Sequence, residues 1–249
     1  MTEDRVILVT GSSRGIGGTL VSEFAREGFR VVLNYAQSQA EAEALHRRLA
    51  EQCGADRVLL RQADVANRDE VKAMFDAAAH RFGRVDVLVN NAGLNIDGPF
   101  LAMTDEQWGR VIATNLTGAF ICAQEFALRF RGEVGHIINF SAATGLRGRK
   151  NGANYCSAKA GVITLTKCLA LELAPKIRVN CILPGTMNTE EVMTRYHLYD
   201  PGNLERKVSA IPMGRLGTTE DVYRVVRFLV RDADYITGQN FLVNGGDVM

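Results

Sequence analysis

Tyr155 and Lys159 are the residues whose types and spacing most directly suggest chemistry, in the run Tyr155-Cys156-Ser157-Ala158-Lys159. On a helix this spacing places both side chains on one face, one turn apart. A free phenol has a pKa of about 10, and a neighbouring ammonium stabilises the phenolate and lowers that pKa. We therefore expect Tyr155 to exchange a proton with a carbonyl or alcohol oxygen. Because such pairs also occur on ordinary helices, the motif needs a second signal.

A glycine-rich turn near the N-terminus supplies that signal. Residues 11–17 read Gly-Ser-Ser-Arg-Gly-Ile-Gly and follow a short apolar run, residues 5–10, and precede a helical pattern. In that context the glycines let the backbone approach a pyrophosphate, which the helix N-terminus binds through its free N–H groups. The alternative is a plain tight turn, and three glycines at this spacing favour the cofactor. The residues assigned to this site are Gly11, Ser13, Arg14, Gly15, Ile16 and Gly17.

The end of the second predicted strand, residues 30–35, bears on which dinucleotide binds. An NAD enzyme usually has an Asp or Glu near this point to bind the ribose 2′-hydroxyl. This chain has Asn34, Tyr35 and Ser38 there, so no carboxylate repels a 2′-phosphate. Arg14 is available to pair with that phosphate, although it could also be a solvated turn residue. The sequence therefore favours NADP(H) over NAD(H).

Strands and helices alternate along the rest of the chain. Strands are expected at residues 5–10, 30–35, 57–63, 85–89, 136–141, 177–183 and 239–243. This alternation predicts an α/β fold, a single Rossmann-type domain over residues 1–249 with a doubly wound, seven-stranded parallel sheet flanked by helices. Ligands bind such sheets at the carboxyl ends of the strands. Further cofactor residues are expected there, namely Asp64, Val65, Asn91, Ala92, Gly93, Pro184 and Gly185.

Two segments have less regular patterns. A long helical stretch over residues 104–131 carries Asn115 among apolar residues, either as a packing or capping residue or at a functional kink. Residues 190–215 lack strong periodicity and contain the breaker Pro201-Gly202. Because long segments of this kind are more often functional than structural, we expect residues 186–215 to form a substrate-binding lid.

Composition excludes several classes of protein. The chain has 29 Lys and Arg residues against 28 Asp and Glu, so nothing indicates a nucleic-acid or acidic membrane partner. We find no apolar run of the ~20 residues that a membrane helix needs, and an acidic N-terminus unlike a signal peptide. The cysteines are scattered and odd in number, and the histidines lack metal-ligand spacing. We expect a soluble, cytoplasmic protein with free thiols and no metal site.

Taken together, the motifs resemble the short-chain dehydrogenase/reductase family over essentially the whole chain. The closest similarity is to the 3-oxoacyl-acyl-carrier-protein reductase type, through Leu33-Asn34-Tyr35, residues 212–217 and residues 238–246. The resemblance implies an NADP(H)-dependent oxidoreductase that interconverts a ketone, such as a 3-oxoacyl thioester or similar β-keto compound, and a secondary alcohol. The matching motifs are TGxxxGIG at residues 10–17, NNAG at residues 90–93, YxxxK at Tyr155 and Lys159, and the PG turn at Pro184-Gly185.

The same resemblance implies roles for individual residues and an assembly. Tyr155 is the general acid in reduction, and Lys159 binds the nicotinamide ribose while tuning Tyr155. Asn115 holds a water in the proton relay. Thr189 and the backbone of Met187 bind the carboxamide. The substrate is implied to be a small molecule or a carrier-bound acyl group, and the protein a homotetramer.

One position departs from the family pattern. Counted back from Tyr155 and from Gly145, the position of the catalytic serine falls on Ala142. Ser141 stands one residue early, and because a one-residue step at a strand end reverses the side chain's direction, Ser141 is a doubtful substitute. Thr144 is another candidate. Losing one such donor typically lowers the rate about 10²–10³-fold, so we expect impaired rather than abolished catalysis.

Cations gather in the loop before Tyr155, at Arg147, Arg149 and Lys150. They could attract an anionic substrate or an acidic carrier, or they could simply be solvated. Three further cations could extend such a patch, namely Arg129, Arg131 and Lys176.

Two alternative functions remain open. Ala142 favours a catalytically weakened dinucleotide-binding protein that acts as a partner subunit or sensor. The presence of Tyr155, Lys159 and Asn115 together favours an enzyme. An alcohol or sugar dehydrogenase of the same family is the other alternative.

Overall fold

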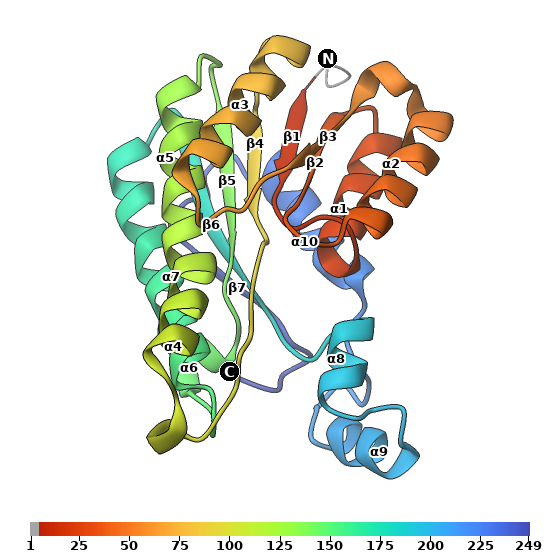
Figure 1. Ribbon diagram of the computed structural model, residues 1–249, viewed down its shortest axis with the longest axis vertical. Coiled ribbons are helices and arrows are strands. Elements are labelled where there is room, and N and C mark those ends of the chain that lie inside the picture. The colour runs from red at the N-terminus through yellow and green to blue at the C-terminus, as the bar shows by residue number, and fades with distance from the viewer. Residues whose placement is uncertain (1–4) are drawn as a thin grey trace.

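The computed structural model describes residues 5–249, and its seven strands form one parallel sheet in the order β3-β2-β1-β4-β5-β6-β7 (Figure 1). The order reverses between β1 and β4, which is where a doubly wound sheet opens a crevice for a ligand. The predicted fold class is thereby confirmed, with strand ends within two residues of those expected. The acidic residues 1–4 lie outside the described part of the chain. The strands are β1 (Val6–Val9), β2 (Arg30–Tyr35), β3 (Val58–Gln62), β4 (Val87–Asn90), β5 (Gly135–Phe140), β6 (Ile177–Pro184) and β7 (Asn240–Val243).

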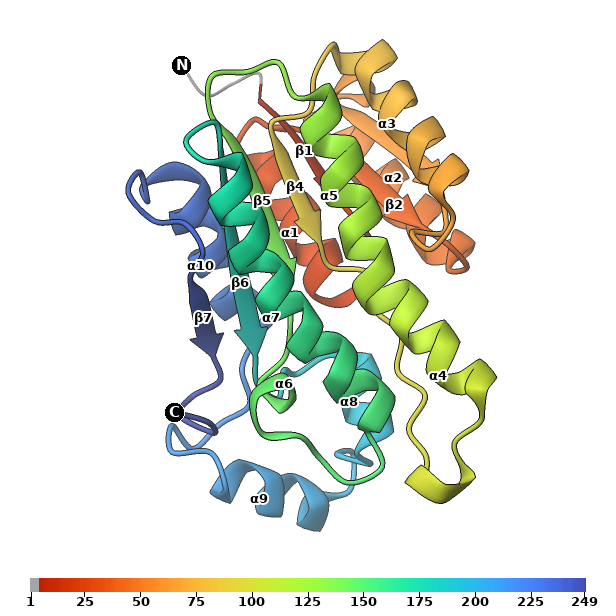
Figure 2. The same ribbon diagram turned by 90° about the vertical axis from the view of Figure 1, so that its left-hand side faces the viewer.

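Helices cover both faces of the sheet, as Figures 1 and 2 show. On one face lie α1 (Gly15–Arg26), α2 (Gln39–Cys53) and α10 (Thr219–Arg231), and on the other lie α3 (Arg68–Phe82), α5 (Gly118–Arg129) and α7 (Ala153–Leu173). The central strands β1, β4 and β5 are therefore buried along their whole length. This double burial is the reason that the sequences of β1 and β4 are almost continuously apolar rather than alternating, whereas β5 also buries His136 and Asn139.

The helical stretch expected over residues 104–131 is divided by a π-helical turn. Here α4 (Asp105–Ile112) runs into the π-helical residues Ala113–Thr117, and α5 follows. The buried Asn115 lies within the π turn, so the helix departs from regular α-helical geometry at this residue. Such π turns occur frequently at functional sites.

By length and composition alone, the helical stretch Asp105–Arg129 could also cross a membrane, although it contains no unbroken apolar run of that length. Half of its apolar window is buried inside the protein, and the buried Glu125 on it is ion-paired. These contacts identify a core helix of the fold.

Short helices occupy the region beyond the carboxyl ends of the strands (Figure 2). The segment at residues 186–215, expected to be irregular, contains two of them, each started by a side-chain cap from Thr189 or Asp200. A third follows β5 directly. The short helices are α6 (Thr144–Arg147), α8 (Glu190–Arg195) and α9 (Pro201–Ser209), with the 3₁₀ turns Ala55–Arg57 and Phe100–Ala102 elsewhere.

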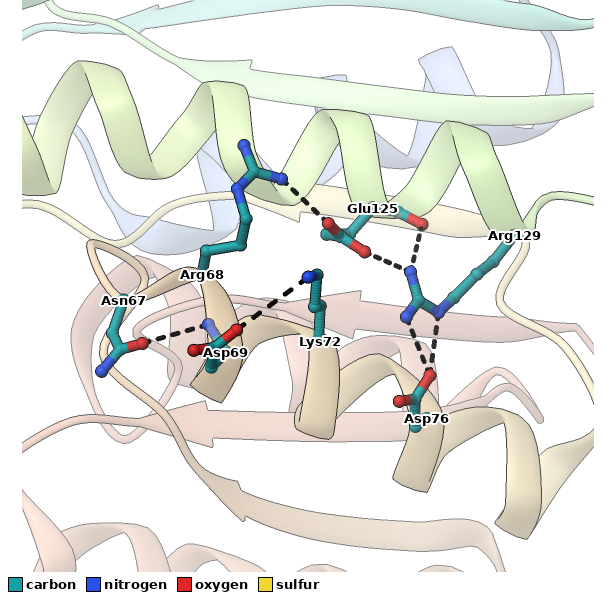
Figure 3. Close-up of polar contacts among 7 residues, drawn as sticks. All are labelled: Asn67, Arg68, Asp69, Lys72, Asp76, Glu125 and Arg129. Carbon is teal, nitrogen blue, oxygen red and sulfur yellow. Dashed lines mark hydrogen bonds and ion pairs between the residues drawn. The ribbon is translucent and has the colours of Figure 1, made fainter.

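A network of charges joins α3 to α5 on the outer side of the sheet (Figure 3). The carboxylate of Glu125 is buried and accepts hydrogen bonds from Arg68, at 2.9 Å, and from Arg129. Arg129 also donates two hydrogen bonds to Asp76, at 3.0 and 2.9 Å. Each charge in the network thus has an opposite partner, which a buried carboxylate requires.

Candidate active site

A cavity of about 980 Å³ lies at the carboxyl ends of the strands, between the glycine turn and the α8–α9 segment. Every residue that the sequence assigned to cofactor binding lines it. Tyr155, Ser141 and Ala142 line it as well, and Asn115 does not. The predicted cofactor residues and Tyr155 therefore share one cavity.

Close backbone packing holds the glycine turn against the end of β4. Gly11 has a φ of +59°, and a Cβ there would lie 2.8 Å from Ala92 Cα. A Cβ on Gly17 would lie 2.6 Å from Asn91 Nδ2. That amide donates hydrogen bonds to the carbonyls of Thr10 and Gly11, both at 2.9 Å. The glycines are thus required by the close approach of two strand ends, and Asn91 locks this approach in place.

The side chain of Asn34 connects β2 to the same turn. Its Oδ1 accepts a hydrogen bond from the Gly11 amide at 3.0 Å, and its Nδ2 donates to the Ala63 carbonyl at 3.0 Å. Asn34 borders the cavity, but both ends of its amide are already bound within the protein. Its structural role is therefore to position the glycine turn.

The N-terminus of α1 faces the cavity with its first-turn N–H groups available. Arg14, at the N-cap, forms no side-chain cap, and the first turn contains no acidic residue. The Arg14 guanidinium is half-exposed, and its ion-pair contact to Glu41 is long, at 4.0 Å. A helix N-terminus beside an available guanidinium fits the phosphates of a dinucleotide.

A tight turn closes the opposite side of the cavity after β6. A Cβ on Gly185 would lie 2.7 Å from Asn244 Cα, so only glycine fits between β6 and the chain after β7. Met187 is buried just beyond, and Thr189 accepts a hydrogen bond from Val192 N while capping α8. Gly185, Met187 and Thr189 all line the cavity, which the carboxamide contact implied for Met187 and Thr189 requires.

Burial controls the proton affinities of Tyr155 and Lys159. Lys159 Nζ donates to the Phe140 carbonyl at 2.8 Å and lies 5.5 Å from the centroid of the Tyr155 ring. Burial lowers the pKa of Lys159 to about 8 and raises the pKa of Tyr155 to about 12, although the charges of Arg195 and Arg149 act to lower the latter. The expectation of a lowered phenol pKa is therefore wrong for this structure, because it counted the neighbouring charge and omitted desolvation.

Asn115 lies directly behind the cavity wall. Its Nδ2 donates to the carbonyls of Leu94, at 2.7 Å, and Val111, at 2.9 Å, while its Oδ1 is buried without a partner. A Cβ on Gly93 would lie 3.1 Å from that Oδ1 and 3.8 Å from Lys159 Nζ. The unpaired oxygen and the ammonium thus flank the same short piece of backbone. A water there would give Asn115 Oδ1 its missing donor.

At the serine position, Ala142 lines the cavity and offers no hydroxyl. Ser141 Oγ donates a hydrogen bond to the Lys159 carbonyl at 2.8 Å, so its proton is committed to the α7 backbone. This hydrogen bond agrees with the expectation that Ser141 is a doubtful substitute for the catalytic serine.

Asn95 is a cavity residue that sequence reasoning missed. Both its amide atoms are buried without a partner, and it lines the cavity. The carbonyls on either side of it accept hydrogen bonds from Asn115 and Asn154, and Asn154 in turn accepts from the Tyr155 amide at 2.7 Å. Its polar type just beyond a strand end, after the NNAG motif, was the available signal.

Cations do lie at the mouth of the cavity. Arg149 is held by two hydrogen bonds to Asp97, at 2.6 and 2.7 Å, with its guanidinium 5.2 Å from the centroid of the Tyr155 ring. Arg147 also lines the cavity, whereas Lys150 does not. Sequence reasoning missed two cations from the short helices, Arg195 and Lys207.

The proposed extension of this patch is wrong. Arg129 belongs to the α3–α5 network (Figure 3), and Arg131 donates to backbone carbonyls at the end of α5. Lys176 immediately precedes β6. All three lie toward the amino ends of the strands, away from the cavity, because α5 and α7 run antiparallel to the strands they cover.

Comparisons with known proteins agree with the motifs. Residues 11–247 match a family model described as enoyl-(acyl carrier protein) reductase. A 3-oxoacyl-[acyl-carrier-protein] reductase of Synechocystis sp. is 42% identical over 98% of this chain and 97% of its own. A 3beta-hydroxysteroid dehydrogenase 1 of Eggerthella lenta is 40% identical over 97% of this chain and 93% of its own.

A solved structure supports the same assignment. The short-chain dehydrogenase/reductase "Glucose/ribitol dehydrogenase" from Brucella melitensis superposes with a TM-score of 0.91 and 30% identity, over 99% of this chain and 98% of that one. With the fold, the glycine turn and the Tyr155–Lys159 pair in place, the chain belongs to the short-chain dehydrogenase/reductase family of oxidoreductases.

Proposed function

We propose that this protein is an NADP(H)-dependent reductase that converts a 3-oxoacyl thioester, or a similar β-keto compound, into the secondary alcohol. The observation that carries the proposal is the single cavity that joins the glycine turn to Tyr155 and Lys159. The 3-oxoacyl reductase and the hydroxysteroid dehydrogenase among the relatives are both named for chemistry at a carbonyl or alcohol carbon. We therefore favour a ketone over the carbon–carbon double bond in the family model's description.

Tyr155 supplies the proton in this proposal. A phenol whose pKa is raised to about 12 by burial is fully protonated near neutral pH, so it can donate to a ketone oxygen. Lys159, with a pKa lowered to about 8 by burial, still carries a positive charge for most of the time at pH 7. When bound, NADPH supplies the hydride.

Arg14 selects NADP(H) over NAD(H). Its guanidinium stands at the N-cap of α1 beside the cavity, and the end of β2 carries Asn34 and Tyr35 instead of a carboxylate. A guanidinium forms two parallel hydrogen bonds with a phosphate, which an NAD ribose does not offer.

The mouth of the cavity suits an acyl group on an anionic carrier, or a small anionic substrate. Arg149, Arg195 and Lys207 border it from three separate elements, and because Arg149 is paired with Asp97 and Arg195 with Glu191, the attraction rests mainly on Lys207. The segment at residues 186–215, which carries two of these cations, would act as the lid. We also propose that the protein is a homotetramer, with Leu171, Phe228 and Leu242 as exposed apolar side chains on the elements that would form interfaces.

The test is to follow oxidation of NADPH and NADH with a short 3-oxoacyl thioester. We expect turnover with NADPH and at least a tenfold lower kcat/KM with NADH. If NADPH binds but no 3-oxoacyl thioester is reduced, the substrate assignment is wrong. Failure to bind NADPH overturns the cofactor assignment.

A hydroxysteroid, sugar or other alcohol dehydrogenase is the second candidate, because one relative is a hydroxysteroid dehydrogenase at 40% identity. Oxidation needs Tyr155 to accept a proton, so its rate should rise with pH toward the phenol pKa of about 12. NADP⁺ reduction with a panel of secondary alcohols at alkaline pH would identify this activity. The third hypothesis is a catalytically weakened partner or sensor protein. It requires tight NADPH binding with neither ketone reduction nor alcohol oxidation.

A further inference from the structure

The guanidinium of Arg149 lies over the ring of Tyr155. Its central carbon, Cζ, is 5.2 Å from the ring centroid, slightly closer than Lys159 Nζ at 5.5 Å. Both distances are within the ~6 Å over which a cation attracts the face of an aromatic ring. Arg149 comes from the loop before α7 and lines the cavity together with Tyr155. The phenol therefore has a second cation beside it, outside the Tyr155–Lys159 motif.

Several contacts hold the Arg149 side chain in this position. Nη1 and Nη2 donate hydrogen bonds to the two oxygens of Asp97, at 2.6 and 2.7 Å, and Nη1 also donates to the Tyr196 hydroxyl at 3.4 Å. The stem packs on Gly152, where a Cβ would lie 2.8 Å from Arg149 Cγ and Nε. Arg149 is thus fixed in the cavity wall, with 17% of its side chain exposed.

The loop that carries Asp97 is itself fastened to the α7 side of the cavity. Asp97 lies beyond the end of β4, and the residues on both sides of it form hydrogen bonds across to the other loop. Asn154 Nδ2 donates to the Ile96 carbonyl at 2.8 Å, and the Gly98 amide donates to the Asn151 carbonyl at 2.9 Å. Two loops that are distant in sequence therefore fix the place of the guanidinium together.

The ion pair with Asp97 leaves Arg149 poorly suited to anchor an anionic substrate. Both of its terminal nitrogens already donate to a carboxylate, so a substrate carboxylate or phosphate would have to compete for them. The hydrogen bonds of a guanidinium lie in its plane, and its face stays free to contact a ring. In this structure that ring belongs to Tyr155. The charge of Arg149 is therefore placed against the proton donor.

A second arginine near the phenol is placed differently. Burial raises the pKa of Tyr155, and the charges of Arg195 and Arg149 both act against this rise. Arg195, on α8, is paired with Glu191 and lies over the ring of Tyr196. Arg149 lies over the ring of Tyr155 itself. The direct contact with the ring singles out Arg149.

We propose that Arg149 is a positioning residue for Tyr155, whose guanidinium holds the phenol ring and stabilises the negative charge that develops on it as its proton leaves. The proposal rests on the function proposed above and adds a residue to its site. During reduction the O–H bond of Tyr155 breaks, the proton passes to the substrate oxygen, and the electron pair of the bond stays on the phenolate. Arg149 neither gains nor loses a proton. A cation over the ring attracts a phenolate more strongly than a phenol, so it favours the transition state over the ground state.

The test is Arg149→Met, which removes the charge and keeps a long apolar stem. Reduction with NADPH is assayed on an uncharged β-keto ester and on a 3-oxoacyl thioester of coenzyme A, which is anionic. We expect kcat to fall about 10–30-fold with both substrates, the range that corresponds to a desolvated contact between a cation and a ring, and KM to change less than threefold. Lys150→Met is the matched control, because Lys150 is an exposed cation of the same loop that does not line the cavity. Its kcat should stay within twofold of the wild type.

The decisive comparison uses Tyr155→Phe as a second background. If Arg149 acts through the phenol, adding Arg149→Met to Tyr155→Phe should change the residual kcat by less than twofold, because no charge then develops on the ring. A role in folding alone would lower kcat equally in both backgrounds. Thermal unfolding and the Kd for NADPH identify any variant that fails to fold, and Arg149→Gln then replaces Arg149→Met.

Three results would overturn the inference while leaving the proposed function intact. The first is an Arg149→Met enzyme with the kcat of the wild type on both substrates. The second is a raised KM for the coenzyme A thioester alone, which would make Arg149 an anchor for the anionic substrate. The third is an equal loss of kcat in the two backgrounds. If the wild type itself reduces neither substrate, the proposed function fails first, and the inference fails with it.

Discussion

Two polar regions of this molecule treat their buried groups in opposite ways. Between α3 and α5, both oxygens of the buried Glu125 carboxylate accept hydrogen bonds, from Arg68 and Arg129 (Figure 3). Arg129 is itself paired with Asp76. At the cavity, by contrast, polar atoms of Asn95, Asn115 and Thr144 are buried without partners.

We expect this difference to distinguish polar groups that stabilise the fold from polar groups that contact a ligand. An unpaired buried polar atom costs about 1–3 kcal/mol, so a protein keeps several together only where something else compensates for them. In the α3–α5 network the protein supplies all partners itself, which favours stability and one fixed arrangement. At the cavity, substrate, cofactor or water could supply the partners, whereas four further unpaired atoms among residues 5–249, on Arg5, Asn90, Arg178 and Asn240, belong to residues that do not line it. Substitutions should therefore affect activity in one region and stability in the other.

Tyr155→Phe should give the largest effect. We expect kcat to fall about 10²–10⁴-fold, because the proton donor is lost, while the thermal unfolding midpoint and the Kd for NADPH change little. Steady-state kinetics and thermal unfolding of the same preparation measure both. A Tyr155→Phe protein with the kcat of the wild type would show that the Tyr155 hydroxyl is not the proton donor, and would contradict a catalytic role for this cavity.

Glu125→Ala should give the opposite result. Its side chain is 3% exposed, so its removal leaves two guanidinium groups without their buried partner. Because Arg68 and Arg129 are 36% and 30% exposed and can be solvated, we expect the free energy of unfolding to fall by about 1–3 kcal/mol, with kcat within twofold of the wild type. The control is Asp76→Asn, at the 67% exposed end of the network, which should cost less than about 1 kcal/mol. Equal losses for the two variants would contradict the assignment of the network's stability to the buried carboxylate.

Arg14→Ala should affect only one cofactor. Losing a charged hydrogen-bonding partner of the 2′-phosphate should raise the KM for NADPH about 10–100-fold and leave the KM for NADH nearly unchanged. The Arg14→Ala variant thus tests whether the Arg14 charge binds the cofactor or, like the charges of the α3–α5 network, stabilises the fold. Parallel changes in both KM values would show that Arg14 acts on the fold of the turn instead.

The buried His136 should make the stability of the protein depend on pH, and this is the smallest of the expected effects. This buried histidine, on β5, lies 3.2 Å from Arg178 through Nε2, and burial and that charge lower its pKa from 6.5 to about 3. Its folded pKa is below its unfolded pKa, so its contribution to stability is complete above pH 6.5 and is lost as pH falls from about 6.5 toward 3.

Between pH 6.5 and 5.5 this loss should amount to about 1 kcal/mol of unfolding free energy. Denaturant titrations of the wild type and His136→Gln at several pH values measure it as a difference in slope. An identical pH dependence in the two proteins would show that His136 is solvated or protonated in the folded state.

The elements of the fold could largely be predicted because their signals are local. Residues 30–35 were expected as a strand and form β2 with those ends. The π turn at Asn115 was not specified, because the choice between a straight helix and a widened turn depends on the side chains packed around it. The two short helices of residues 186–215 were missed for a related reason, since segments of this length have weak periodicity.

The residues of the site also fall into two groups, those that could be predicted from local sequence and those that could not. The glycine turn and the Tyr155–Lys159 pair were readable, because their spacing within one turn or one helix already determines which groups face each other. The direction of the Tyr155 pKa was not, because desolvation depends on every element packed around the phenol. The separation of Arg129 from the cavity cations likewise depends on which end of the sheet each element reaches.

Thus the sequence by itself determined the order of strands and helices, the glycine turn, the Tyr155–Lys159 pair and the alanine at position 142. Only the tertiary structure decided which hydroxyl and amide groups are occupied by the protein and which remain unpaired. Ser141 and Thr144 show why. They are similar residues of one short loop, and whether each finds a partner depends on the α7 backbone that folding brings against them.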